Sequence, residues 1–204
     1  MSKRIGIFAG TFDPIHEGHL AFAHAALKAG VEKVMFMPEP RPRRKQGVRA
    51  FEHRVAMVQR AVADEPRLGT IILEQVSFTP HETLPILQER FKGYELALLF
   101  GDDVVRYMAD HIAAWPHIED IASTASLVIA ARQEEKAALT DTLRTLKSEY
   151  GLPFRYTFVA PDRPGISSSK IRLALKHGKP VQGLPTTVME YIRKAGLYVD
   201  EMIS

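Results

Sequence analysis

Residues 10–19, with the sequence GTFDPIHEGH, constrain the fold of this chain more than any other stretch. An apolar run, Ile5–Ala9, precedes them and indicates a buried strand, and residues 20–28 follow with the pattern of a helix. A strand that turns through glycine into a helix exposes free backbone N–H groups at the helix start, where an anion can bind. His16 and His19 lie three residues apart and therefore fall on one helical face. The stretch thus predicts a strand–turn–helix unit with an anion site.

The same stretch narrows the chemistry. Two imidazoles beside an anion pocket suit phosphoryl or nucleotidyl transfer, because catalysis of these reactions depends on positioning and charge stabilisation. The histidine spacing excludes the metalloprotease pattern, which needs histidines at i and i+4 with glutamate between them. Gly10 does not begin a P-loop, because no Gly-Lys-Ser/Thr follows it. A purely structural glycine turn is the alternative.

The composition indicates one globular domain spanning residues 1–204. A chain of 204 residues with 46% hydrophobic residues can bury a single sizeable core. The lack of cysteine excludes disulfides, thiolate metal sites and a cysteine nucleophile. No signal-peptide pattern and no apolar run of membrane-spanning length occur, so we expect a cytoplasmic chain without a membrane partner. A net charge of +3 is too small to indicate a nucleic-acid partner.

Basic residues gather in the proline-rich segment 38–49. They are Arg41, Arg43, Arg44, Lys45 and Arg49. Pro38, Pro40 and Pro42 favour an extended loop, because proline donates no hydrogen bond to a strand ladder. No aromatic side chain lies among the basic residues to stack on bases. The segment is therefore either a solvated loop or a clamp for the phosphate of a small substrate.

Strand-like and helix-like segments alternate along the chain. Strands are predicted at residues 5–9, 34–37, 70–73, 96–100, 127–131 and 154–159, and helices at 18–29, at 51–62, after a capping box at 79–82, and at 134–150. This alternation is typical of the α/β class. We expect a Rossmann-like open, mostly parallel sheet with helices on both faces and further helices at the C-terminus. Ligands of such sheets bind beyond the carboxyl ends of the strands, where residues 10–19, residues 101–103 and the segment after Val159 lie.

A second informative stretch, residues 165–172, has the sequence GISSSKIR. Serines before an apolar-periodic run are good helix N-caps, so capping alone can explain any one of them. Lys170 and Arg172 in the first turn oppose the helix dipole, by roughly 0.3–1 kcal/mol each. A bound polyphosphate would reverse that penalty. The stretch therefore predicts a second phosphate site, at a helix N-terminus.

Residues 10–19 together with Ile166–Arg172 resemble the nucleotidyltransferase superfamily, whose signatures are of the HxGH and ISSxxxR types. Within this superfamily, the chain is most similar to the bacterial nicotinate-nucleotide adenylyltransferase family. The two terminal motifs are specific for the superfamily, and the similarity extends over almost the whole length. The further similar positions are residues 51–54 and 57, Gly101, Asp103, Trp115, Arg132, and the tail at 188–192 and 196–198.

The resemblance implies adenylyl transfer in NAD biosynthesis. The phosphate of nicotinate mononucleotide attacks the α-phosphorus of ATP in line, which gives deamido-NAD and pyrophosphate without a covalent enzyme intermediate. Magnesium is implied as a cofactor carried by ATP, and no metal ligands of the protein are implied. The implied partners are ATP and a mononucleotide, and homo-oligomerisation is left open.

The resemblance also assigns roles to residues. Catalytic roles fall on His16, His19, Lys45 and Arg172. ATP-binding roles fall on Gly10, Thr11, Phe12, Gly18, Gly101, Asp103, Ile166, Ser167, Ser168 and Ser169. Acceptor-binding roles fall on Thr79, Trp115 and Arg132. The chemistry agrees, because fixed cationic donors stabilise a transition state in which charge accumulates around the α-phosphorus.

Two loops depart from the family pattern and leave the phosphate acceptor open. Residues 42–45 read PRRK where the family has PPHK, and residues 77–84 read SFTPHETL where the family has SYTxDTL. The alternatives are a sister enzyme that uses CTP or another acceptor, such as phosphopantetheine, and a nucleotide-binding regulator without turnover. A phosphohydrolase is disfavoured, because the sequence offers no carboxylate cluster for a catalytic metal pair.

Outside these motifs we expect ordinary structural roles. Arg54 is predicted to be an exposed helical arginine, with a side chain that faces phosphate as the alternative. The histidines without a partner pattern are assigned to the surface or the core rather than to ligation; they are His24, His53, His111, His117 and His177.

Overall fold

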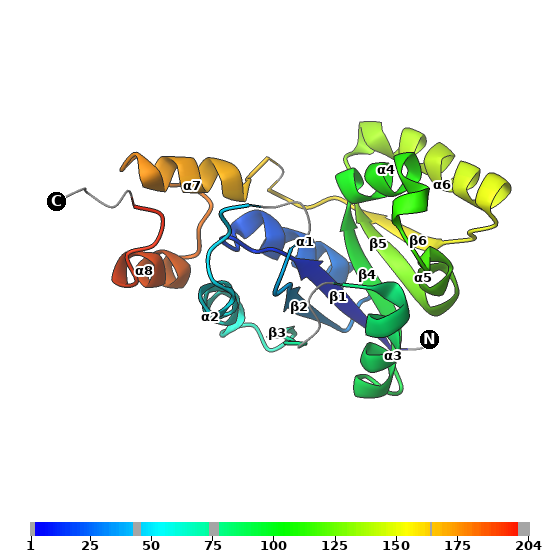
Figure 1. Ribbon diagram of the computed structural model, residues 1–204, viewed down its shortest axis with the longest axis horizontal. Coiled ribbons are helices and arrows are strands. Elements are labelled where there is room, and N and C mark those ends of the chain that lie inside the picture. The colour runs from blue at the N-terminus through cyan, green and yellow to red at the C-terminus, as the bar shows by residue number, and fades with distance from the viewer. Residues whose placement is uncertain (1–2, 43–45, 74–77, 164, 200–204) are drawn as a thin grey trace.

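The computed structural model describes residues 3–42, 46–73, 78–163 and 165–199. In these ranges strands and helices alternate along the chain (Figure 1). The strands are β1 (Arg4–Gly10), β2 (Lys33–Pro38), β3 (Leu68–Thr70), β4 (Glu95–Gly101), β5 (Ala125–Ala130) and β6 (Arg155–Val159). The helices are α1 (Glu17–Lys28), α2 (Phe51–Val62), α3 (Pro80–Arg90), α4 (Asp102–Asp110), α5 (Ile118–Thr124), α6 (Lys136–Tyr150), α7 (Ser168–Lys176) and α8 (Thr186–Lys194), with short 3-10 turns at η1 (Ile112–Ala114) and η2 (Gln133–Glu135).

The strands of the described residues form one parallel sheet in the order β3-β2-β1-β4-β5-β6. The predicted Rossmann-like class of sheet is confirmed. β1 is central, since Ile7 pairs with Met35 of β2 on one side and with Leu98 of β4 on the other. The strand order reverses between β1 and β4, and a crevice opens beyond the carboxyl ends of strands at such a point.

Helices cover both faces of the sheet, as predicted. Successive side chains of a strand point to opposite faces, so each buried strand reads as a continuous apolar run. In β4, Leu96 and Leu98 pack into a core with α3, α4, α5 and α6, whereas Ala97 and Leu99 pack into a core with α1, α2 and α8. Figure 1 shows α7 and α8 at the end of the molecule opposite α6. Within the described ranges, every helix is too short or too polar to cross a membrane.

The third strand lies earlier than the sequence predicts. The prediction places it at residues 70–73, whereas β3 ends at Thr70. Its position follows the hydrogen bonds to β2: the Val34 N–H donates to the Arg67 carbonyl, and the Ile71 N–H donates to the Phe36 carbonyl, both at 2.9 Å. The predicted boundaries are therefore wrong, because pairing with the neighbouring strand decides them and apolar content does not.

The start of α3 also differs in detail from its prediction. Pro80 occupies the first turn as expected. In the predicted capping box, Glu82 would accept from the Thr79 N–H, but that N–H donates to Oγ1 of Thr83 at 3.1 Å. The Glu82 carboxylate instead accepts from the Thr79 hydroxyl at 3.2 Å. The capping-box prediction is wrong, because Thr83 is buried beside this amide whereas Glu82 is exposed.

Candidate active site

A cavity of about 800 Å³ opens at the carboxyl ends of β1 and β4. Residues 10–19 and 165–172 both contribute to its wall, together with Gly101 at the end of β4 and Pro161 after β6. The predicted site residues on its wall are Gly10, Thr11, Phe12, His16, Gly18, His19, Gly101, Asp103, Arg132, Ile166, Ser167, Ser168, Ser169 and Arg172. The structure therefore brings two distant stretches of sequence into one cavity at the reversal of strand order.

The two histidines of the first stretch stack on each other at the start of α1. Their ring centroids are 3.6 Å apart, and the rings are inclined by 23°. The His16 backbone N–H donates to Nδ1 of His19 at 3.2 Å, so a neutral His19 carries its proton on Nε2. The rings of Phe8 and Phe12 contact the His19 ring edge to face, at centroid distances of 5.8 and 5.1 Å. His19 is thus held with a defined tautomer, and its Nε2–H can donate to a phosphate oxygen.

His16 is buried, with only 6% of its surface exposed. Burial lowers the pKa of its imidazole from 6.5 to about 4, because the charged form loses hydration. Gly18 permits this placement, since a Cβ at position 18 would lie 3.0 Å from Nδ1 of His16. His16 is therefore neutral at pH 7 in the unliganded protein, so the stacked pair does not bring two positive charges together.

This burial predicts a loss of stability in mild acid. The folded-state pKa of His16 lies below the unfolded value of 6.5. The buried neutral side chain therefore contributes fully to the free energy of unfolding above pH 6.5, and this contribution is lost as the pH falls towards 4. The lost free energy of unfolding is about 3 kcal/mol over this window. We expect His16→Asn, which retains a good N-cap residue, to flatten this dependence when urea unfolding is measured between pH 7.5 and 4. An equal slope in both proteins would contradict the assignment.

Asp13 joins the first stretch to the C-terminal third of the chain. Its carboxylate accepts a hydrogen bond from the Tyr198 hydroxyl at 2.5 Å, and its backbone carbonyl accepts one from Nη1 of Arg172 at 2.7 Å. Ser168 Oγ donates to the Pro14 carbonyl at 2.9 Å, across 154 residues of sequence. Burial and the bond to Asp13 raise the pKa of the Tyr198 hydroxyl well above 10, so it stays protonated and donates. These bonds fix the position of residues 10–19 relative to residues 165–172.

Arg54 also holds the turn after β1 in place. The prediction of an exposed arginine is wrong. Only 1% of its surface is exposed. Its guanidinium donates to the carbonyls of Thr11 at 2.8 Å, Pro40 at 3.0 Å and Arg49 at 3.0 Å. Burial lowers the pKa of the guanidinium, and the nearby Asp13 charge raises it. Arg54 thereby holds the turn that contains Phe12, whose φ of 49° is unusual for a residue other than glycine.

Ser167 and Ser169, in residues 165–172, have different roles. Ser167 caps α7, because its Oγ accepts from the Lys170 N–H at 3.3 Å. Ser169 Oγ accepts from Nη2 of Arg172 at 3.3 Å, which orients the guanidinium. Capping therefore accounts for Ser167 alone. The first turn of α7 and Arg172 line the cavity, so their N–H groups are candidate donors to phosphate.

Charges of both signs line the cavity. Asp102 forms an ion pair with Arg106 at 3.6 Å, and Arg163 is paired with Glu17 in the first turn of α1. The Asp103 carboxylate folds back over Gly101, where the Cβ of any other residue would collide with it. Glycine at the end of β4 thus lets an acidic side chain lie at the mouth of the crevice.

Three predicted residues are not among those that line the described cavity wall. Lys45 falls outside the described residues. Thr79 and Trp115 do not appear on the described part of the cavity wall. Trp115 is half-buried against the core, with its ring 6.3 Å from that of Phe100. The roles of these three residues in binding or catalysis stay predictions.

Sequence reasoning missed two contributors to the site. The helical periodicity could have indicated that Arg54 is buried. Arg54 lies four residues before the buried Val58 and thus on the apolar stripe of α2. Tyr198 belongs to the tail that is similar to the family, and no local pattern indicates its bond to Asp13. Both residues act through contacts between segments that are distant in sequence.

Comparisons with known proteins agree with this geometry. The model of the family described as Cytidylyltransferase-like matches residues 7–174. A protein of Desulfitobacterium hafniense (strain Y51) named "Probable nicotinate-nucleotide adenylyltransferase" is 37% identical, with 96% of each chain covered. A protein of Thermus thermophilus with the same name is 36% identical, with 96% of this chain and 99% of that protein covered.

Among solved structures, Plasmodium falciparum nicotinic acid mononucleotide adenylyltransferase complexed with NaAD superposes with a TM-score of 0.72. Its sequence is 19% identical, and the match covers 96% of this chain and 97% of that one. This structural similarity shows the fold, whereas the sequence relatives show the family. With both signatures on one cavity wall and relatives of this identity along its length, the chain belongs to the nicotinate-nucleotide adenylyltransferase family of nucleotidyltransferases.

Proposed function

We propose that the protein transfers AMP from ATP to the phosphate of nicotinate mononucleotide, releasing pyrophosphate and forming deamido-NAD. The observation that carries this proposal is the single cavity lined by His16, His19 and the start of α7. Such a cavity offers donors to a triphosphate from two sides. The family relatives support the choice of ATP and nicotinate mononucleotide as substrates.

The proposed reaction is an in-line displacement at the α-phosphorus. A phosphate oxygen of the acceptor forms the new P–O bond, and the bond to the β-phosphate oxygen breaks, so pyrophosphate leaves with the electron pair. Neither histidine forms a covalent bond. The Nε2–H of His19 is proposed to donate to an α-phosphate oxygen as charge accumulates there, while Arg172 and the start of α7 bind the β- and γ-phosphates.

The neutral state of His16 fits a role in ground-state positioning. A bound triphosphate would raise the pKa of a buried imidazole beside it, because the negative charge favours the protonated form. Mg²⁺ enters as part of the MgATP substrate, since Mg²⁺ prefers phosphate oxygens and water as ligands.

A pyrophosphate-release assay tests this function. ATP and CTP are each offered with nicotinate mononucleotide, nicotinamide mononucleotide and phosphopantetheine. We expect release with ATP and nicotinate mononucleotide. Release only with another acceptor or with CTP would keep the nucleotidyltransferase class and discard the proposed substrate, and ATP binding without release in any mixture would favour a regulator.

The altered loops make the acceptor panel necessary. Phe78 stands where the family has tyrosine, and its backbone N–H donates to Oε1 of Glu39 at 3.1 Å. Thr79, Trp115 and Arg132 remain the proposed acceptor contacts, with Lys45 as a further catalytic cation. A cytoplasmic location is proposed with them, and the oligomeric state is left open.

A further inference from the structure

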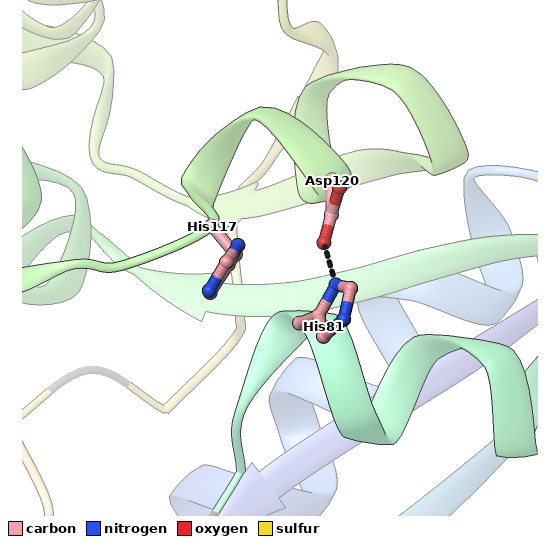
Figure 2. A group of neighbouring side chains, drawn as sticks. All are labelled: His81, His117 and Asp120. Atoms are coloured by element: carbon pink, nitrogen blue, oxygen red, sulfur yellow. Dashed lines mark hydrogen bonds and ion pairs between the residues drawn. The ribbon is translucent and has the colours of Figure 1, made fainter.

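Two histidines and an aspartate meet on the surface between α3 and α5. His81 lies in the first turn of α3, His117 immediately precedes α5, and Asp120 lies in the first turn of α5. One ligand atom from each residue lies within 4.8 Å of the others. Figure 2 shows the three side chains facing one another across the gap between the two helix starts.

The contacts inside this cluster are short. His81 Nδ1 lies 3.2 Å from Oδ2 of Asp120, and the His81 and His117 rings stack with centroids 4.6 Å apart at 29°. The contact with Asp120 involves His81 and does not account for the position of His117 beside both residues. Two imidazoles and one carboxylate thus present their ligand atoms to one small volume, where a cation could bind all three.

We propose that His81, His117 and Asp120 bind a divalent transition-metal ion, with Zn²⁺ as the best match. Two imidazole nitrogens and one carboxylate oxygen are a common zinc donor set, and three protein ligands leave a fourth position for water or a substrate group. Zinc–ligand distances of about 2.0–2.2 Å bring tetrahedral donors closer together than 4.8 Å, and rotation of the exposed histidines supplies the difference. Mg²⁺, which prefers an oxygen shell, does not fit this donor set.

The scaffold under the cluster fixes the two helix starts. Leu84 and Leu87 of α3 pack in the same buried core as Ile118 and Ile121 of α5. Both backbones that carry ligands are therefore anchored on the hydrophobic core. A metal ion at the surface would add a cross-link between two elements whose relative position is already set, so little reorganisation opposes binding.

The site also links the two segments that carry candidate acceptor residues. Thr79 precedes His81 by two residues, and Trp115 precedes His117 by two residues. Resting on the proposed function, the bound ion would steady these segments and lower the KM for the acceptor, with little change in kcat. The ion would be separate from the Mg²⁺ carried by ATP, because His81, His117 and Asp120 do not line the phosphate cavity.

The test is metal binding by the full-length protein after treatment with a chelator. Calorimetric titration with ZnCl₂ at pH 7.5 should give one site per chain and a higher melting temperature, whereas MgCl₂ at the same concentrations should give neither. His117→Asn keeps a residue that tolerates the φ of 61° at this position, and Asp120→Asn keeps the side-chain shape. Each should weaken zinc binding at least about 10–100-fold, the loss known for residues that support metal ligands.

His111→Ala is the matched control. His111 is an exposed histidine stacked on Tyr107, outside the cluster, and its replacement should leave the affinity for zinc unchanged. Absence of a stoichiometric site, or equal zinc affinity in wild type, His117→Asn and Asp120→Asn, would overturn the proposal. Zinc binding that depends on the cluster in a protein that uses none of the acceptors would uphold the metal site and reject the proposed function.

Discussion

Replacing His19 with alanine should lower kcat by about 10²–10³-fold, which corresponds to roughly 2.7–4 kcal/mol of transition-state stabilisation. The His16 N–H and the stacking fix the His19 ring on the cavity wall, and its Nε2–H is the proposed donor. It is preorganised, so its loss removes an interaction that strengthens as charge develops at the α-phosphorus. The measurement is steady-state pyrophosphate release at saturating ATP and acceptor.

His24→Ala is the matched control for this variant. His24 lies on the same helix α1 but away from the phosphate cavity, and its replacement should leave kcat near wild type. Circular dichroism and urea unfolding should show that His19→Ala remains folded. A folded variant with unchanged kcat would refute a catalytic role for His19.

Arg54→Met should lower the free energy of unfolding by about 3–5 kcal/mol, because it removes one partner of a buried charged network. Methionine retains the buried stem of the side chain but donates no hydrogen bond. The carbonyls of Thr11 and Pro40 would lose their bonds to the guanidinium, and the Asp13 carboxylate would lose a nearby positive charge. Urea unfolding at pH 7.5 measures the loss.

Arg60→Met provides the comparison on the same helix. Arg60 is exposed, with its guanidinium over the Tyr191 ring at 4.2 Å and bonded to the Ala56 carbonyl. Its replacement should cost less than about 1 kcal/mol, as exposed charged contacts do. If the two variants were equally stable, the three carbonyl bonds of Arg54 would not contribute to folding as inferred.

The strands and the position of the site could be predicted from the sequence, because both rest on local signals. Strands buried on both faces give apolar runs, and glycine turns at the ends of β1 and β4 mark the edge where ligands bind. The start of β3 could not be predicted in this way. Its residues, Leu68–Thr70, carry no apolar run, and hydrogen bonds to β2 place them in the sheet.

The side chains that hold the site together were harder to predict. Arg54 and Tyr198 are polar residues whose burial becomes favourable only when carbonyls or a carboxylate from distant segments satisfy them. His81 and His117 are 36 positions apart and meet only because α3 packs beside α5. The sequence left His117 to the surface or the core rather than to ligation, and the structure exposes it. Its neighbours depend on tertiary packing, which no local pattern encodes.

The bond between Asp13 and Tyr198 ties the first loop of the chain to almost its last described residues. A ribosome must therefore synthesise the chain as far as residue 198 before this loop can acquire its native contacts. Nascent chains that already contain the whole sheet, β1 to β6, would still lack Tyr198, which bonds to Asp13 in the loop after β1. During synthesis the cavity wall built by residues 10–19 thus stays unsecured until 185 residues have followed Asp13.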